Sequence, residues 1–162
     1  MTLQQFFLKQ KEAVRARSRD VFSMIQAEDM TWKPENGTLS VGELLRHLWV
    51  SEEGVRQCAL EGDFKYYEIR VPKGLHAVMG VPGSLEDELK NIERVHAETV
   101  RAVGALPEAA FDEERSHAAL GFRRKVGVML FGINEHEIHH RAQLMTYLRM
   151  LGTPVPLKLG KN

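Results

Sequence analysis

Several features that would direct a protein to a particular compartment or partner are missing from this 162-residue chain. It has one cysteine, Cys58, which excludes an internal disulfide and is typical of a reducing compartment. Its 22 basic and 22 acidic residues cancel, so we expect no strong attraction to nucleic acid or to an anionic membrane. No apolar run approaches membrane-spanning length, and the N-terminus carries no charged-then-apolar secretion pattern. These absences predict a cytoplasmic protein with no nucleic-acid or membrane partner.

Helical spacing of apolar residues dominates the sequence that remains. Four segments show this spacing: residues 3–26, 40–62, 84–106 and 123–151. Thr2 with Gln5 and Ser40 with Glu43 match the capping box, and Ser84 is a good N-cap. No strand pattern and no repeat accompanies these segments. We therefore predict an all-α fold, a four-helix bundle, in a single domain over residues 1–162.

A connection rich in turn formers joins the first two segments, at residues 27–40, and two more irregular connections follow. Residues 63–83 have no clear period and form a connection that is unusually long for a compact domain. It is long enough to recross the bundle or to line the mouth of a pocket. Residues 108–121 form a second irregular connection, and a basic run at residues 123–125 follows it. We interpret this run as a solvated cluster, and binding of an anion or of a partner's acidic group is the alternative. Ligand sites in such bundles form between facing helices, from side chains that point inward.

Three of the seven histidines lie within five residues near the C-terminus: His136, His139 and His140. Residues four apart on a helix lie on one face, one turn from each other, so His136 and His140 can share a metal ion. His139 is rotated about 100° from His140 and is interpreted as a packing residue. Two buried imidazoles one turn apart would otherwise each need a hydrogen-bond partner, which favours a metal site.

The same stretch satisfies the pattern H-E-x-x-H, which on a helix is typical of zinc proteases with the glutamate as general base. Such proteases often take a third ligand from further along the chain. This chain has no His, Glu, Asp or Cys after His140, which counts against a zincin-like protease. Glu137 is turned away from the two histidines and is interpreted as a solvated helix charge.

His47 is the best candidate for a third metal ligand, because it lies on the inward stripe of the second helical segment. Three neutral imidazoles leave coordination positions open, as in catalytic metal sites. A single histidine on an apolar face is, however, more often a hydrogen-bonded core residue. His96 also lies on an apolar stripe and is interpreted as a core or pocket residue. All-nitrogen ligation suits zinc, nickel, copper or iron.

The chain resembles the DinB family of metal-dependent bundle proteins. The matching parts are WKP at residues 32–34, LSVGELLRHL at 39–48, HEIHHRAQL at 136–144, YLR at 147–149, Gly152 and Pro154. The resemblance implies a four-helix bundle with a long crossover between helices 2 and 3. It also implies a metal site at His47, His136 and His140, and a homodimer. Characterised relatives include thiol-dependent transferases and isomerases, and many others have no known activity.

Two functions are compatible with these residues. The first is a transferase or hydrolase that uses a divalent transition metal, zinc or nickel, to activate water or a low-molecular-weight thiol against a small-molecule substrate. The second is a non-catalytic metal-binding module of a stress response. No residue stands out as a general base.

Overall fold

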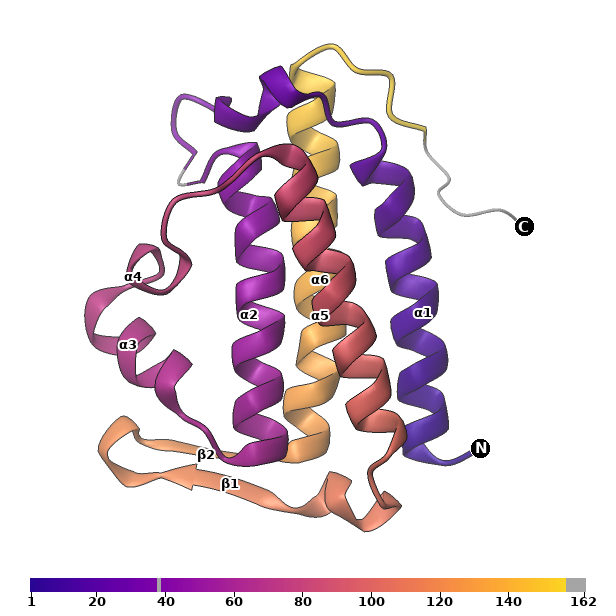
Figure 1. The fold of residues 1–162 in the computed structure, drawn as a ribbon, viewed down its shortest axis with the longest axis vertical. Helices are drawn as coiled ribbons and strands as arrows, with labels where there is room; N and C mark the ends of the chain where they lie inside the picture. Colours follow the sequence, from indigo (N-terminus) through magenta and orange to yellow (C-terminus); the bar gives the residue numbers. More distant parts are fainter. Residues whose placement is uncertain (38, 157–162) are drawn as a thin grey trace.

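The computed structural model of this chain describes residues 1–37 and 39–156. Four long helices stand side by side in a bundle (Figure 1). They are α1 (Leu3–Phe22), α2 (Val41–Glu61), α5 (Leu85–Gly104) and α6 (Val126–Met150). This arrangement confirms the all-α class and the four-helix bundle. Of the predicted domain 1–162, residue 38 and residues 157–162 lie outside the described part.

Side-chain caps begin three of the bundle helices. In each, the N-cap hydroxyl accepts a hydrogen bond from the backbone three residues on, and that residue's side chain bonds back to the cap: the pairs are Thr2 with Gln5, Ser40 with Glu43 and Ser84 with Asp87. These bonds satisfy donors that the first turn of a helix leaves free. Gly62 ends α2 with φ of +70°, which glycine adopts without steric cost. Both predicted capping boxes are therefore confirmed.

The order of the bundle helices depends on the crossover between α2 and α5. α1 and α6 run in one direction and α2 and α5 in the other (Figure 1). α2 packs against α5 and α6, and α1 packs against the same two helices. Residues 62–84 carry the chain back along the outside of α2, so that α5 starts at the same end of the bundle as α2. This is the predicted long crossover.

The crossover is less irregular than its sequence pattern predicts. It contains two short helices, α3 (Lys65–Lys73) and α4 (His76–Met79). Their apolar period escapes detection because α3 has nine residues, one of which is Pro72, and α4 has only four. In so short a helix, only two or three residues lie on any one face, which is too few to show a period. Tyr66 anchors α3 on α2, where it is 8% exposed.

The second connection also contains regular structure, and the prediction of no strands was wrong there. Strands β1 (Glu114–His117) and β2 (Phe122–Lys125) form an antiparallel hairpin at one end of the bundle (Figure 1). α6 consequently begins at Val126 rather than near Arg123. The strands have only four residues each and carry mostly charged side chains, so no apolar alternation marks them. Short 3-10 helices complete the fold: η1 (Ala27–Thr31), η2 (Glu108–Asp112) and η3 (Ala118–Leu120).

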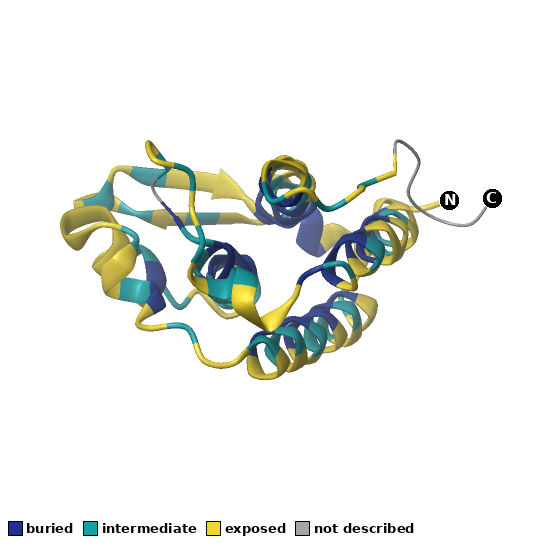
Figure 2. Ribbon diagram, turned by 90° about the horizontal axis from the view of Figure 1, so that it is seen from above, coloured by how far each residue is buried: buried dark blue, intermediate teal, exposed yellow. Residues whose placement is uncertain are grey.

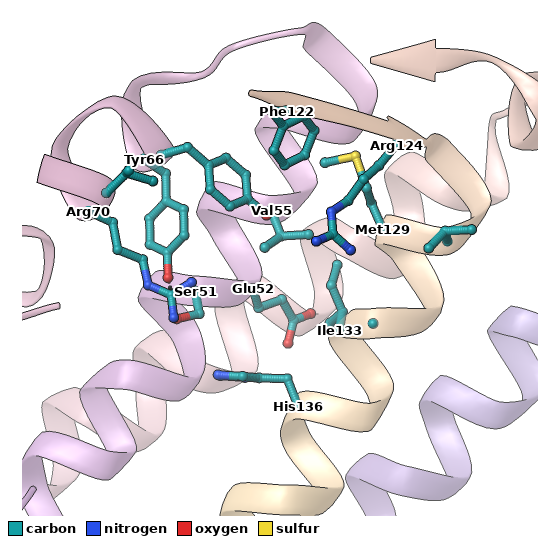
Figure 3. Close-up of a pocket in the computed structure, with 14 residues that line it drawn as sticks. Ser51, Glu52, Val55, Tyr66, Arg70, Phe122, Arg124, Met129, Ile133 and His136 are labelled. Atoms are coloured by element: carbon teal, nitrogen blue, oxygen red, sulfur yellow. Dashed lines mark hydrogen bonds between the residues drawn. The ribbon is translucent and has the colours of Figure 1, made fainter. Parts of the chain in front are cut away.

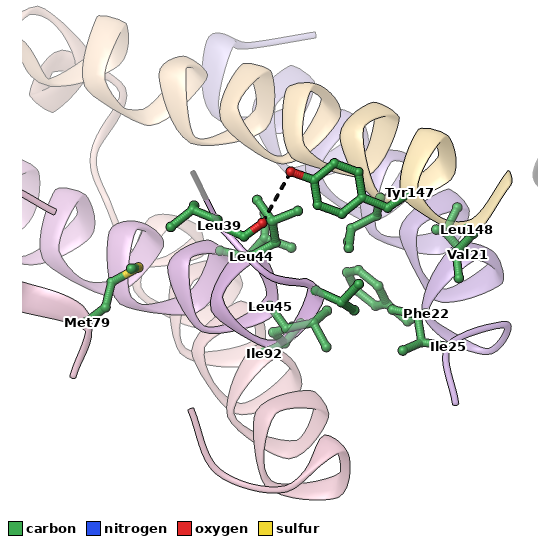
Figure 4. Close-up of a cluster of buried hydrophobic side chains, with 13 residues drawn as sticks. Val21, Phe22, Ile25, Leu39, Leu44, Leu45, Met79, Ile92, Tyr147 and Leu148 are labelled. Atoms are coloured by element: carbon green, nitrogen blue, oxygen red, sulfur yellow. Dashed lines mark hydrogen bonds between the residues drawn. The ribbon is translucent and has the colours of Figure 1, made fainter. Parts of the chain in front are cut away.

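The apolar core consists of two separate clusters, and buried residues face the centre of the bundle (Figure 2). The cluster shown in Figure 4 contains Val21, Phe22, Ile25, Leu39, Val41, Leu44, Leu45, Leu48, Met79, Ile92, Leu144, Tyr147 and Leu148. The other contains Phe7, Cys58, Ala59, Val103, Phe111, Val126, Met129, Leu130 and Ile133. On each bundle helix, the residues between the two clusters are largely polar, and several are buried. This polar layer holds the candidate site.

Candidate metal centre

The structure brings the three predicted histidines together between α2 and α6. One ring nitrogen from each of His47, His136 and His140 lies within 4.8 Å of the other two. His47 is 3% exposed and His140 is 9% exposed. Points this close together lie within about 2.8 Å of a common centre, and imidazole–zinc bonds are about 2.0–2.1 Å long. The cluster can therefore receive a metal ion with small shifts of the side chains.

His47 and His136 make the closest approach in this cluster. Their Nε2 atoms lie 2.9 Å apart, and their ring planes are at 78° to each other. The ring centroid of His140 lies 4.6 Å from that of His47 and 4.4 Å from that of His136. His47 and His136 would hold a metal ion through these two Nε2 atoms.

The remaining ring nitrogen of His47 is held by the protein. His47 Nδ1 lies 2.9 Å from Ser51 Oγ, and Ser51 Oγ lies 2.8 Å from Tyr66 Oη. If Nδ1 carries the proton and donates it to Ser51, the Nε2 lone pair of the neutral ring is free to bind metal. Hydrogen bonds of this kind commonly orient metal-binding histidines.

His140 is oriented by a second chain of hydrogen bonds. Its Nδ1 lies 3.0 Å from Gln143 Oε1, which can only accept, so Nδ1 donates. Gln143 Nε2 donates to Tyr147 Oη at 3.0 Å, and that hydroxyl donates to the Leu39 carbonyl at 3.2 Å. This direction of bonding fixes the tautomer of His140 and leaves its Nε2 free. The donor set therefore fits a metal ion.

Electrostatics favours the neutral form of all three rings, which is the form that binds metals. Burial and the neighbouring imidazoles lower the pKa of His136 to about 2. Burial and the charge on His140 lower the pKa of His47 to about 3, and burial also lowers the pKa of His140. The guanidinium of Arg70 adds to the shift in each case.

Four buried charges adjoin the histidines, and we call them the charge cluster: Lys11, Arg15, Glu52 and Glu137. Lys11 Nζ lies 2.7 Å from Glu52 Oε2 and 3.0 Å from Glu137 Oε2. Arg15 Nε lies 2.9 Å from Glu137 Oε1. All four side chains are at most 4% exposed. Two cations and two carboxylates compensate each other, which is the condition for burying them.

The charge cluster corrects the interpretation of Glu137. The residue is 2% exposed, not solvated, and both of its oxygens accept hydrogen bonds from Arg15. Burial by itself would raise its pKa, but the charges and hydrogen bonds of Lys11 and Arg15 outweigh burial and lower the pKa to about 2. The sequence analysis did not single out Lys11 or Arg15 as buried residues. Their spacing of four from each other, and of Lys11 from Phe7, could have indicated one inward stripe.

The other predicted residues do not join the histidine cluster. His139 is exposed on α6, next to the site. His96 is a buried residue of α5, as expected for the core, and its Nε2 lies 3.3 Å from Glu12 Oε1. In the basic run, Arg123 and Lys125 bind Glu114 and Asp112 at the surface. The structure places the remaining member of this run, Arg124, at a pocket.

A pocket of about 470 Å³ opens beside the histidines (Figure 3). His136 and Ser51 lie at its inner end. Tyr66 and Tyr67 from α3, and Phe122 from β2, supply aromatic walls. The crossover thus lines a pocket, as its length suggested. A pocket of this volume suits a small molecule.

Comparison with known proteins agrees with this arrangement. The sequence model of the DinB superfamily matches residues 10–144, a range that includes the three clustered histidines. The chain belongs to the DinB superfamily. The resemblance predicted from the motifs is thereby confirmed. No curated protein matches this DinB-superfamily chain.

Two crystal structures of DinB-like proteins share the fold. The protein from Bacillus subtilis is 21% identical, with a TM-score of 0.73, and the match covers 96% of this chain and 99% of that one. The protein from Bacillus cereus is 18% identical, with a TM-score of 0.66, and the match covers 92% and 90% of the two chains. At these identities the likeness concerns the fold alone.

Within the described residues of this chain, no helix is both long and apolar enough to cross a membrane.

Proposed function

We propose that this DinB-superfamily protein binds one divalent transition metal, zinc or nickel, through His47, His136 and His140, and acts as a metal-dependent transferase or hydrolase on a small molecule. The supporting observation is a set of three clustered imidazoles with lowered pKa, one of which, His136, lines a small-molecule pocket. Three protein ligands leave at least one position for water or substrate.

The chain's own residues have separate roles in this proposal. Ser51 and Gln143 orient the rings of His47 and His140. Tyr66, Tyr67 and Phe122 supply an apolar surface for the body of a substrate. A metal held by the three histidines would supply Lewis acidity, which lowers the pKa of a water or thiol. A low-molecular-weight thiol is the proposed cosubstrate, and the cytoplasm is the proposed compartment because thiols remain reduced there.

Glu137 has no part in catalysis here. Its carboxylate is occupied by Lys11 and Arg15 on α1, so it is not available as the general base that a zincin requires. Although the chain contains the pattern H-E-x-x-H, the geometry disfavours a protease.

Metal analysis tests the proposal first. Protein purified without a histidine tag should contain about one zinc or nickel ion per chain, and His136→Ala should lose most of it. His139→Ala is the matched control, because His139 is the exposed neighbour on the same helix and should retain the metal. Full metal retention in His136→Ala would contradict the site.

Activity is tested with the metal-loaded protein. The reaction of cysteine or glutathione with 1-chloro-2,4-dinitrobenzene should be accelerated, and chelation should remove the acceleration. The hydrolase branch is tested with p-nitrophenyl acetate under the same two conditions. Bound metal without turnover in either assay would favour the non-catalytic metal-binding module instead.

A homodimer is part of this proposal. Apolar side chains are exposed where α1 and α6 begin: Leu3 is 51% exposed, Phe6 is 44% exposed and Val128 is 57% exposed. Burying such residues between two copies would stabilise an interface. Light scattering should give the mass of two chains, and Phe6→Asp should give the mass of one. A single-chain mass for the unmodified protein would contradict the dimer.

A further inference from the structure

Two guanidinium groups at the pocket have no anionic partner. Arg70 on α3 and Arg124 on β2 both line the pocket, and neither side chain forms an ion pair or a hydrogen bond with any residue that the structure describes. The basic residues on either side of Arg124 differ in this respect. Arg123 Nε lies 2.7 Å from Glu114 Oε1, and Lys125 Nζ lies 2.8 Å from Asp112 Oδ1. The two charges at the pocket are thus free to bind a ligand.

Aromatic rings lie close to both guanidinium groups. Arg70 Cζ lies 5.7 Å from the ring centroid of Tyr66, and Arg124 Cζ lies 5.8 Å from that of Phe122. Cation–π contacts of this kind orient a guanidinium without neutralising its charge. Figure 3 shows the two side chains reaching into the pocket from opposite walls. Guanidinium is also the side-chain group best shaped to bind a carboxylate or phosphate through two parallel hydrogen bonds.

The walls between the two arginines and the histidines are apolar. Val55, Met129 and Ile133 line this part, together with Tyr67. At the inner end, Glu52 presents a buried oxygen, Oε1, that has no hydrogen-bond partner, whereas its Oε2 is held by Lys11 and Arg15. Figure 3 shows this carboxylate pointing into the pocket. An unmatched buried acceptor is unfavourable unless a bound molecule donates to it.

The charge balance of the pocket is positive. Glu52 belongs to the charge cluster, where Lys11 and Arg15 compensate it and Glu137. Arg70 and Arg124 therefore add two positive charges that no described carboxylate offsets. A cleft with one uncompensated sign of charge concentrates ligands of the opposite sign.

We propose that the pocket binds an anionic small molecule with an apolar, aromatic body, whose carboxylate, sulfonate or phosphate lies between Arg70 and Arg124 and whose body extends towards His136. This inference rests on the proposed function, because it names the substrate class of the same site. It assigns Arg70 and Arg124 as specificity-determining residues. Neutral molecules of the same shape bind less tightly because they leave both guanidinium groups unpaired.

A pair of fluorescent probes tests the anion requirement. 8-Anilinonaphthalene-1-sulfonate and N-phenyl-1-naphthylamine have the same aromatic body, and only the first carries a charge. Titrations of the full chain should show at least about tenfold tighter binding of the sulfonate, and added salt should weaken that binding alone. Equal affinities for the two probes would overturn the proposal.

Variants assign the binding to the two arginines. Arg70→Ala and Arg124→Ala should each weaken binding of the sulfonate by about fivefold or more and leave the neutral probe unchanged. Arg123→Ala is the matched control, since it removes the same charge from the same strand outside the pocket, and it should change neither affinity. If Arg123→Ala weakened binding of the sulfonate as much as Arg124→Ala, the effect would come from the net charge of the protein. That result would overturn the assignment. Circular dichroism verifies that each variant folds.

Metal content separates this inference from the proposed function. The titrations are made on the protein as purified and again after chelation. Arginine-dependent binding in both samples supports the inference even where no metal or turnover is found. A metal-loaded, active protein that does not distinguish the two probes would retain the proposed function and refute the anion pocket.

Discussion

At the scale of single residues, His136 and Glu137 illustrate how neighbours in the chain acquire different environments. His136 faces α2 and the pocket, with its Nε2 atom 2.9 Å from that of His47. Glu137 is rotated about 100° around the helix and meets Lys11 and Arg15 of α1. One residue is thus available to a metal ion, and the next helps to fix α6 against α1.

Replacing Glu137 with glutamine should be strongly destabilising. The variant leaves two buried cations with one carboxylate, and losing one partner of a buried ion pair costs about 3–5 kcal/mol. Urea denaturation measures the loss. Glu135→Gln is the control, because Glu135 is exposed on the same helix and its replacement should change the free energy of unfolding by less than about 0.5 kcal/mol. Similar values for the two variants would contradict the importance of the charge cluster.

Cys58 should be unreactive in the folded protein. It is fully buried, and burial raises the pKa of its thiol from 9.0 to about 11, so only about 0.1% is thiolate at pH 8. Iodoacetamide at pH 8, followed by mass spectrometry, should label Cys58 slowly without urea and rapidly with it. Rapid labelling of the folded chain would show that the thiol is accessible.

The same thiol makes stability depend on pH. Below pH 9 the folded and unfolded chains both keep the proton. Between pH 9 and about 11 the unfolded chain loses it first, so stability falls as pH rises through this range. The free energy of unfolding of Cys58→Ala should therefore fall less steeply there than that of the unmodified protein. Equal slopes would argue against the raised pKa.

The sequence revealed only part of this environment. The spacing of four between His136 and His140 predicted one shared face, because helix geometry alone determines it. His47 could be proposed as their partner from its inward stripe and from the family motif. Ser51, Gln143 and the partners of Glu137 could not be found in this way, since their roles depend on which side chains meet across the bundle.

At the scale of elements, a single glycine determines how α3 sits on α2. A Cβ atom on Gly54 would collide with Cγ of Tyr66. The absence of that atom lets the Tyr66 ring lie directly on α2. From there its hydroxyl reaches Ser51, which orients His47. The position of α3 is thereby coupled to the candidate metal centre.

Gly54→Ala should weaken metal binding without touching a ligand. The added methyl group displaces Tyr66 and breaks its bond to Ser51, and loss of such an orienting partner typically lowers metal affinity about 10- to 100-fold. Titration against a competing chelator measures the change. Gly132→Ala is the matched control, because a Cβ there meets nothing within 4 Å and metal affinity should be unchanged. Equal affinities for the two variants would contradict the coupling.

Element boundaries were predictable to the extent that local chemistry determines them. The capping boxes at Thr2 and Ser40, and the glycine at position 62, define helix ends through bonds within a few residues. α3 and the hairpin have no comparable local pattern. They are held by contacts with distant parts of the chain, such as Tyr66 on α2 and Tyr67 against Phe122.

At the scale of the whole molecule, a polar layer separates two apolar clusters. The layer is internally compensated, because the charge cluster is neutral and the histidines make hydrogen bonds to Ser51 and Gln143. The chain's own side chains therefore supply the packing of the bundle and most of the polar contacts in this layer. Small zinc-dependent domains differ, because their ligands organise the fold.

The metal-free protein should consequently remain folded. After chelation, circular dichroism at 25 °C should show the same helical content, and unfolding should remain cooperative. The midpoint temperature of unfolding should fall only by the amount expected when a protein loses the stabilisation of one bound ligand. A collapse of helical content on chelation would instead identify the metal as a structural element of the bundle.

The pocket and the histidine cluster are built in part from different segments of the chain. Arg70 belongs to the crossover and Arg124 to the hairpin, and neither segment is one of the four bundle helices. The crossover and the hairpin can change in length or composition while α2 and α6, which carry the three histidines, stay the same. In this chain, substitutions in the crossover or the hairpin can therefore alter the lining of the pocket without changing the helices that carry the three histidines.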